Sequence, residues 1–112
     1  MRESNLAAWR EDNMSGENKL PPTHPGEVLA LDFLEPMGIT EYRLAKAIGV
    51  PQTRISEIIR GKRGISVDTG RRLSRAFGMT DQFWINLQMR YDLEIARDAH
   101  PEVDLIEPLI SA

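Results

Sequence analysis

Residues 52–57 bring together polar side chains that can hydrogen-bond to the edges of nucleic-acid bases. The residues with this chemistry are Gln52, Thr53, Arg54, Ser56 and Glu57. Glutamine and arginine can each make paired hydrogen bonds to one base, adenine and guanine respectively. Glu57 can accept a hydrogen bond from a cytosine amino group or orient a neighbouring arginine, and the sequence leaves both roles open. These residue types predict that the segment reads DNA base edges.

Positively charged side chains lie on both sides of this segment. Arg60, Lys62 and Arg63 follow it, and Arg43 and Lys46 precede it. Long cationic side chains bind phosphate oxygens and fix a protein's register on the duplex without reading its sequence. We therefore predict that these five residues contact the DNA backbone.

The distribution of charge supports this interpretation, although the whole chain has a net charge of −3. Residues 40–78 hold nine of the fourteen basic residues and only three acids, so this stretch is +6 and the rest of the chain is −9. A local cluster makes a local field that overall charge conceals. A basic face that is merely solvated remains the simpler alternative.

The spacing of residues 40–63 predicts a helix-turn-helix. With Glu41 as its first position, the small Ala45 falls where the second helix crosses closely, and Gly49 falls at a turn that favours positive φ. Buried positions are taken by Leu44, Val50, Ile55 and Ile58. The second helix of such a motif lies in the DNA major groove, and its first residues meet base edges. An ordinary helical hairpin, or a helix-turn-helix used only to bind protein, stays open.

Helix signals along the chain predict a compact all-α domain of five helices. Thr23 or His24 caps the first, Pro25 starts it, and Pro36 and Gly38 stop it. Thr40 caps the second and Gly49 ends it; Val50-Pro51 starts the third and Gly61 ends it. Ser66 caps the fourth, which Gly78 closes; Thr80 caps the fifth, which Pro101 ends. The domain is expected at 23–100, after a flexible arm at 1–22 that has room for a short helix at 6–10, and before a tail at 101–112.

The last helix carries two apolar stripes. One consists of Trp84, Leu87, Tyr91 and Ile95, and the other of Ile85, Met89, Leu93 and Ala96. The stripe centres lie roughly 150° apart on a helical wheel, and a helix lying on a single core needs only one stripe. We predict that the second stripe is a homodimer interface, or that the tail folds back over it. The tail itself is acidic with scattered apolar residues, and it either frays or docks on a partner.

Several function classes are excluded or disfavoured by composition. Without cysteine, the chain can form neither disulfides nor a cysteine-ligated zinc site. The two histidines, His24 and His100, are expected at helix ends and exposed, and no metal-ligand spacing or glycine-rich phosphate loop is found. We expect neither enzymatic activity nor a cofactor. No apolar stretch is long enough for a membrane span or secretory signal, so we expect a cytoplasmic protein.

Longer motifs within residues 24–93 resemble the HigA antitoxins, also called VapI, a branch of the Xre/Cro-like, lambda-repressor-like helix-turn-helix proteins. The matching features are His24-Pro25-Gly26-Glu27, the helix-turn-helix followed by Gly61-Lys62, and the stretch from Asp81-Gln82-Phe83-Trp84 to Tyr91-Asp92-Leu93. The resemblance is most specific in the first and last of these, because the helix-turn-helix alone would indicate only the superfamily.

The resemblance implies a bacterial homodimer that binds double-stranded operator DNA, represses its own operon and neutralises a HigB-like toxin, a ribosome-dependent mRNA endonuclease. It places base reading at Gln52, Thr53, Arg54 and Glu57, and phosphate contacts at Arg60, Lys62 and Arg63. A stand-alone transcriptional regulator without a toxin partner is the alternative. A protein-interaction module that does not bind DNA is the third.

Overall fold

The computed structural model describes residues 21–110 of the chain, and helices are the only regular secondary structure in this part. In chain order they are α2 (Pro25–Val28), η1 (Leu29–Leu34), α3 (Glu35–Met37), α4 (Glu41–Ile48), α5 (Gln52–Ile59), α6 (Val67–Phe77), α7 (Gln82–Ala99) and η2 (Pro101–Leu105). The all-α prediction is confirmed. The arm predicted at 1–22 lies outside the described residues except for its last two, and so does its short helix.

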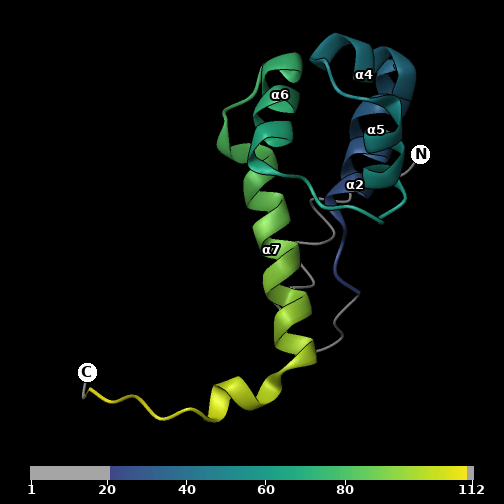
Figure 1. The fold of residues 1–112 in the computed structure, drawn as a ribbon. Coiled ribbons are helices and arrows are strands. Elements are labelled where there is room, and N and C mark those ends of the chain that lie inside the picture. The colour runs from purple at the N-terminus through teal and green to yellow at the C-terminus, as the bar shows by residue number, and fades with distance from the viewer. Residues whose placement is uncertain (1–20, 111–112) are drawn as a thin grey trace.

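Two groups of helices make up the body of the fold (Figure 1). The segment from α2 to α5 forms one side, and α6 with the first half of α7 forms the other. The second half of α7 extends beyond the body, and the C-terminal segment turns away from its end. The helix-turn-helix of α4 and α5 therefore lies at the opposite end of the molecule from the tail.

The first helical segment runs from Pro25 to Met37 without a break, but its middle part is π-helical. The N–H of Glu35 donates to the carbonyl of Ala30, five residues earlier. The prediction that Pro36 stops this helix was wrong, since Pro36 lies inside α3 and the left-handed Gly38 ends it. Proline supplies no N–H and its ring clashes with the carbonyl four residues before it. The wider π register in the preceding turn accommodates both effects.

Side chains cap the helices at three of the predicted starts. The ring of His24 accepts a hydrogen bond from the N–H of Gly26, Thr40 accepts from Arg43, and Ser66 accepts from Thr69. The prediction for Thr80 was wrong. Asp81 precedes α7 without a side-chain cap, and the backbone carbonyl of Thr80 accepts from the N–H of Phe83 at 3.2 Å. A backbone turn, rather than a hydroxyl, begins the last helix.

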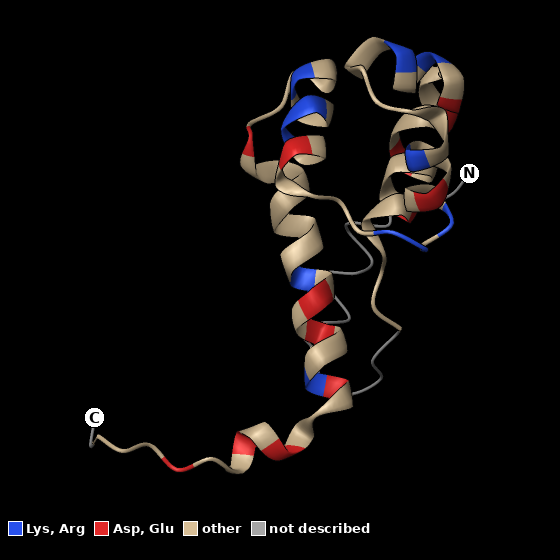
Figure 2. Ribbon diagram, in the orientation of Figure 1, with Lys and Arg blue, Asp and Glu red and all other residues tan. Residues whose placement is uncertain are grey.

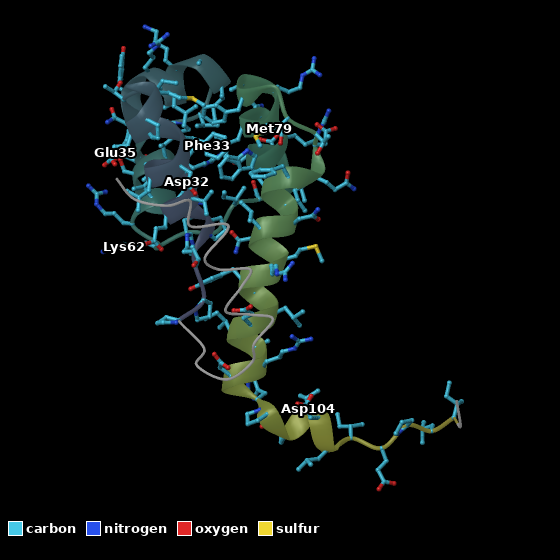
Figure 3. The ribbon with its side chains drawn as sticks, turned by 180° about the vertical axis from the view of Figure 1, so that it is seen from behind. Asp32, Phe33, Glu35, Lys62, Met79 and Asp104 are labelled. Carbon is cyan, nitrogen blue, oxygen red and sulfur yellow. The ribbon has the colours of Figure 1, made fainter. Side chains whose placement is uncertain are left out.

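Apolar side chains from every main helix meet in one core. The core residues are Val28, Leu29, Leu34, Leu44, Ala45, Ile48, Ile55, Ile58, Ile65, Leu73 and Trp84. Trp84 is fully buried, with Phe33 and Phe83 packed against it at centroid distances of 5.0 and 5.1 Å. In Figure 3, Phe33 points from its helix toward the middle of the body, in the direction of Met79. This cluster fixes α7 against the first helical segment.

The two stripes of α7 have different environments along the helix. In the first stripe Trp84, Leu87 and Tyr91 face the body, but Ile95 is exposed. In the second stripe Ile85 packs inside the subunit, because a Cβ on Gly70 of α6 would lie 3.2 Å from its side chain. Of the four residues predicted at a homodimer interface, Met89, Leu93 and Ala96 are exposed, and only Ile85 packs within its own subunit.

Candidate DNA-binding surface

The turn between α4 and α5 shows why the motif needs a small residue and a glycine. Ala45 is buried where the helices cross, and its carbonyl accepts hydrogen bonds from the N–H groups of both Gly49 and Val50. Gly49 has φ = 76°, a left-handed conformation that costs little only for glycine. The C-terminal end of α4 is also held from α6, where Arg72 donates to the carbonyl of Ile48 at 2.7 Å. These contacts fix the angle of α5.

Helix α5 divides its residues between the core and the outside. Ile55 and Ile58 are fully buried and anchor the helix. Gln52 and Thr53, in its first turn, are exposed, and Arg54 is half-buried. Pro51 precedes the helix and no side chain caps it. Because no side chain caps α5, its first backbone N–H groups can hydrogen-bond to a ligand placed there, as can the exposed side chains beside them.

Two of the predicted base-reading residues have partners within the protein. The Ser56 hydroxyl donates to the carboxylate of Glu41, at the start of α4, over 2.5 Å. The carboxylate of Glu57 accepts from Arg63 Nε at 2.7 Å. This ion pair corresponds to one of the two roles predicted for Glu57, the orientation of a neighbouring arginine. Ser56 and Glu57 thus hold neighbouring elements in place. Among residues 21–110, no hydrogen bond or ion pair restrains the side chains of Gln52, Thr53 and Arg54 in this way.

The predicted phosphate-binding residues lie around α5. Figure 2 shows basic positions on α4, on α5 and in the loop that follows α5, while acids predominate along the C-terminal segment. Arg60, Lys62 and Arg63 are exposed at the end of α5 and in this loop, and Arg43 is exposed on α4. Lys46 reaches back to Tyr42 on its own helix, with its amine 3.4 Å from the hydroxyl and 5.6 Å from the ring centre.

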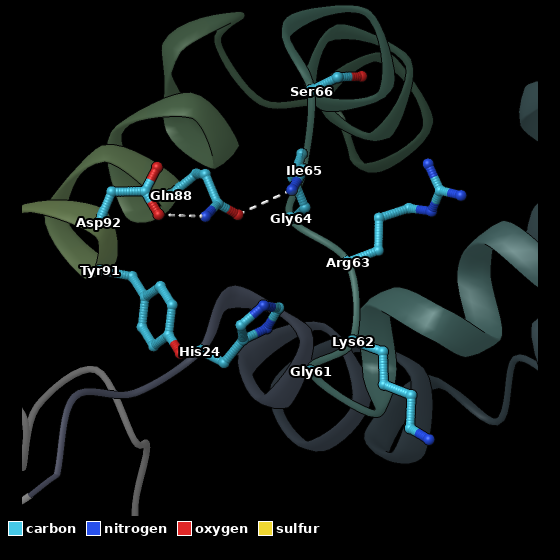
Figure 4. A pocket seen from close by; sticks show the side chains of 10 residues that line it. All are labelled: His24, Gly61, Lys62, Arg63, Gly64, Ile65, Ser66, Gln88, Tyr91 and Asp92. Carbon is cyan, nitrogen blue, oxygen red and sulfur yellow. Dashed lines mark hydrogen bonds between the residues drawn. The ribbon is translucent and has the colours of Figure 1, made fainter. Parts of the chain in front are cut away.

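Sequence reasoning missed a polar contact that ties the loop after α5 to α7 (Figure 4). Gln88 accepts a hydrogen bond from the N–H of Ile65 at 2.7 Å and donates to Asp92 at 2.9 Å. Together with His24 and Tyr91, these residues line a cavity of about 470 Å³ beside the loop. An isolated glutamine on a helix gives no sequence signal for such a contact. The loop that carries Lys62 and Arg63 is therefore anchored to the last helix.

His24 lies at the start of a helix, as the sequence indicated, but it is not exposed. It is part-buried, it caps α2, and its ring meets the ring of Tyr91 edge-on at 4.9 Å. Burial lowers the pKa of His24 below its ordinary value, against the opposing effect of the carboxylates of Asp92 and Glu27. A neutral ring suits its position, because Nδ1 must be unprotonated to accept from the N–H of Gly26. His100, in contrast, is exposed at the end of α7.

In the part of the chain that the structure describes, residues 21–110, no group of three or more histidine, aspartate or glutamate side chains is arranged to hold a metal ion. None of the helices in this part of the chain is both long enough and apolar enough to cross a membrane.

Comparison with known proteins relates this geometry to a family. Residues 32–84 match the helix-turn-helix family model. Virulence-associated protein I of Dichelobacter nodosus is 45% identical over 95 residues, which cover 85% of this chain and 88% of that protein. Antitoxin HigA-1 of Vibrio cholerae is 37% identical over 94 residues, covering 83% and 89%.

A solved structure, Pseudomonas aeruginosa antitoxin HigA with the higBA promoter, is 42% identical and superimposes with a TM-score of 0.74, covering 80% of this chain and 99% of that one. The chain thus shares its sequence with these relatives over most of their length, and it shares its fold with the P. aeruginosa protein over 99% of that chain. The chain belongs to the HigA and VapI family of Xre-like helix-turn-helix antitoxins, which are non-enzymatic regulators.

Proposed function

We propose that this chain is an antitoxin that binds its own operator as a homodimer and neutralises a HigB-like toxin. The observation that carries the DNA-binding part is the first turn of α5, where Gln52 and Thr53 are exposed on a helix whose other face is locked into the core. The P. aeruginosa relative, solved with promoter DNA, supports the same use of this fold. A protein with this role acts in the bacterial cytoplasm, where the operator and the toxin are.

Within this proposal the residues of α5 divide into two roles. Gln52, Thr53 and Arg54 contact base edges, because they stand in the half of the helix that enters the major groove. Ser56 and Glu57 position the surface, since each is hydrogen-bonded to another element of the motif. Arg63, held by Glu57, is presented to a phosphate in a fixed orientation, which lowers the entropy lost on binding.

The DNA contacts of the proposal can be tested by measuring binding to a duplex from upstream of this gene and to a shuffled duplex. Arg54→Ala should reduce discrimination between the two by about 1–3 kcal/mol, because one base contact is lost. The matched control is Arg71→Ala, since Arg71 pairs with Asp81 at the turn into α7 and not with α5. Equal losses on both duplexes would make Arg54 a phosphate contact instead.

The salt dependence of binding tests the five predicted phosphate contacts of each chain, apart from the base contacts. Ten phosphate contacts from a dimer predict that the logarithm of the binding constant falls with the logarithm of salt concentration with a slope of about −9. A slope near zero would contradict an electrostatic backbone clamp. Two recognition helices about 34–36 Å apart would also require half-sites spaced by one helical turn, which footprinting would detect.

The toxin part rests on the relatives named as antitoxins. The alternative, a stand-alone regulator, has the same DNA-binding surface and differs only in lacking the partner. Coexpression of this chain with the product of the neighbouring gene, followed by purification, should return a complex. Recovery of the chain alone, with operator binding intact, would favour the stand-alone regulator.

A further inference from the structure

The C-terminal segment, residues 101–110, combines exposed aliphatic side chains with acids and contains no basic residue. Its large apolar residues are Val103, Leu105, Ile106, Leu109 and Ile110, each more than half exposed, with Leu105 and Ile110 at 80%. Glu102, Asp104 and Glu107 alternate with them. Figure 3 shows Asp104 in the turn of η2, beyond the end of α7, from which the segment continues away from the body. Such a segment buries little on its own subunit.

The second half of α7 has an exposed apolar strip with arginines along one edge. Met89 and Leu93 are 63% and 49% exposed, and Ala96 is exposed beside them. Arg90 and Arg97 stand three residues before and four residues after Leu93, so the spacing places them on the same side of the helix. The arginines line one edge of the apolar strip, and Asp92, three residues after Met89 and four before Ala96, lies at the other edge. The arginine edge and the exposed apolar side chains complement a segment in which aliphatic residues alternate with acids.

The geometry separates these two surfaces within one chain. After Pro101 the backbone makes one turn of η2 and then points away from α7 (Figure 1). A second copy, related by two-fold symmetry, can bring its own α7 to the segment and receive the first copy's segment in return. The two halves of the contact would then be identical, as such an interface requires.

The area that a stable dimer must bury also favours an interface that includes the C-terminal segment. A stable interface buries about 800 Å² on each partner, some 20–30 residues a side. Met89, Leu93 and Ala96 are three side chains of one helix and supply only a small part of this area. The C-terminal segment adds five large aliphatic residues that are otherwise in water.

We propose that residues 101–110 act as an exchanged arm, which docks on the Met89–Leu93–Ala96 face of α7 in a second copy of this chain. The inference rests on the homodimer proposed above and specifies how it is held together. It assigns the arm to the other subunit rather than to the toxin. The acids of the arm lie near Arg97 of the partner in this arrangement.

Cross-linking of the full chain tests the exchange directly, because the protein has no cysteine of its own. Leu105→Cys chains are mixed with differently tagged Leu93→Cys chains and oxidised. The proposal predicts a mixed disulfide-linked dimer, since the two Cβ atoms must come within about 4 Å to bond. The matched control replaces Leu93→Cys by Val67→Cys on α6, where the native side chain is also well exposed, at 62%.

The doubly substituted Leu93→Cys, Leu105→Cys chain distinguishes an arm that docks on a second copy from an arm that folds back onto its own α7. A disulfide within single chains would show that the arm covers its own α7, and it would overturn the proposal. Cross-linking as strong with Val67→Cys as with Leu93→Cys would overturn it too, because contact would then be unspecific.

A second measurement follows the dimer by sedimentation. Leu105→Ser with Ile106→Ser should raise the dissociation constant of the dimer by at least about tenfold, because two buried aliphatic side chains are lost. Arg97→Glu should also weaken the dimer, and Asp104→Arg in the same chain should restore part of the loss.

Different results would contradict the exchanged arm and the homodimer. An unchanged dimer in the Leu105→Ser, Ile106→Ser variant would overturn the exchange and leave the homodimer proposal intact. If that variant also lost toxin binding, the arm would belong to the toxin interface. Wild-type chains that sediment only as monomers at micromolar concentration would remove the homodimer and the exchange together.

Discussion

Replacing Gly26 with alanine should separate the first helical segment from α5. Gly26 is buried at the start of α2, and its Cα faces the end of the recognition helix. A Cβ atom built there would lie 1.8 Å from the carbonyl oxygen of Ile58 and 2.6 Å from its carbonyl carbon. Both are backbone atoms, so no side chain can rotate away to make room.

The size of the effect follows from these distances. Ordinary contact for a Cβ begins at 3.4 Å, so the two backbones must move at least about 1.5 Å apart. Overpacking a core costs about 1–3 kcal/mol, and a clash between backbones belongs at the upper end. We expect Gly26→Ala to lower the free energy of unfolding by about 3 kcal/mol. For a domain of this size the melting temperature should fall by roughly 12–24 °C.

Thermal and urea unfolding at one fixed protein concentration measure this effect, since dimerisation makes the midpoint depend on concentration. Gly38→Ala is the matched control. Gly38 also lies at an end of the first helical segment, with φ = 65° and no atom within 4 Å of a new Cβ, so it should lose only about 1–2 kcal/mol from the left-handed backbone. A Gly26→Ala protein as stable as Gly38→Ala would refute the reasoning.

Two further predictions concern the caps. Stability should decrease as pH falls below about 6.5, the ordinary pKa of histidine, because His24 has a lowered pKa in the folded state and the unfolded chain binds the proton more readily. His24→Asn keeps a capping oxygen and should lose most of this slope in urea titrations between pH 7.5 and 5.5; an unchanged slope would assign it to other groups. Thr40→Ala removes the oxygen that accepts from the N–H of Arg43 and should cost about 1 kcal/mol, whereas Thr40→Ser should be near neutral.

Helix ends could be predicted where the cause lies within a few residues of the chain. Thr40 and Ser66 cap α4 and α6 as their positions indicated, and Gly49 ends α4 in the left-handed conformation. The requirement is local: the first N–H groups of a helix need acceptors, and its C-terminal end favours a residue that tolerates positive φ. Thr80 shows the limit, because a backbone turn can begin a helix as well as a hydroxyl can.

The candidate site could be located from the sequence. Which of its polar residues face outward and which are hydrogen-bonded within the protein could not be predicted from it. Gln52 and Thr53 are exposed in the first turn of α5, and Arg54 beside them is half-buried. Ser56 and Glu57 have the same polar character, yet each is bonded to an element that only the folded chain brings near. Donors and acceptors on side chains do not reveal whether their partner is a base or another residue.

Composition and spacing alone determined the helical fold, the helix-turn-helix and the basic segment around it, because periodicity, caps and charge are properties of neighbouring residues. Tertiary structure decided the rest. It decided that Gly26 must be glycine, that Gln88 anchors the loop after α5, and that Ile85 packs inward while Met89 and Leu93 do not. Each of these depends on a close approach between segments far apart in sequence, which no local pattern records.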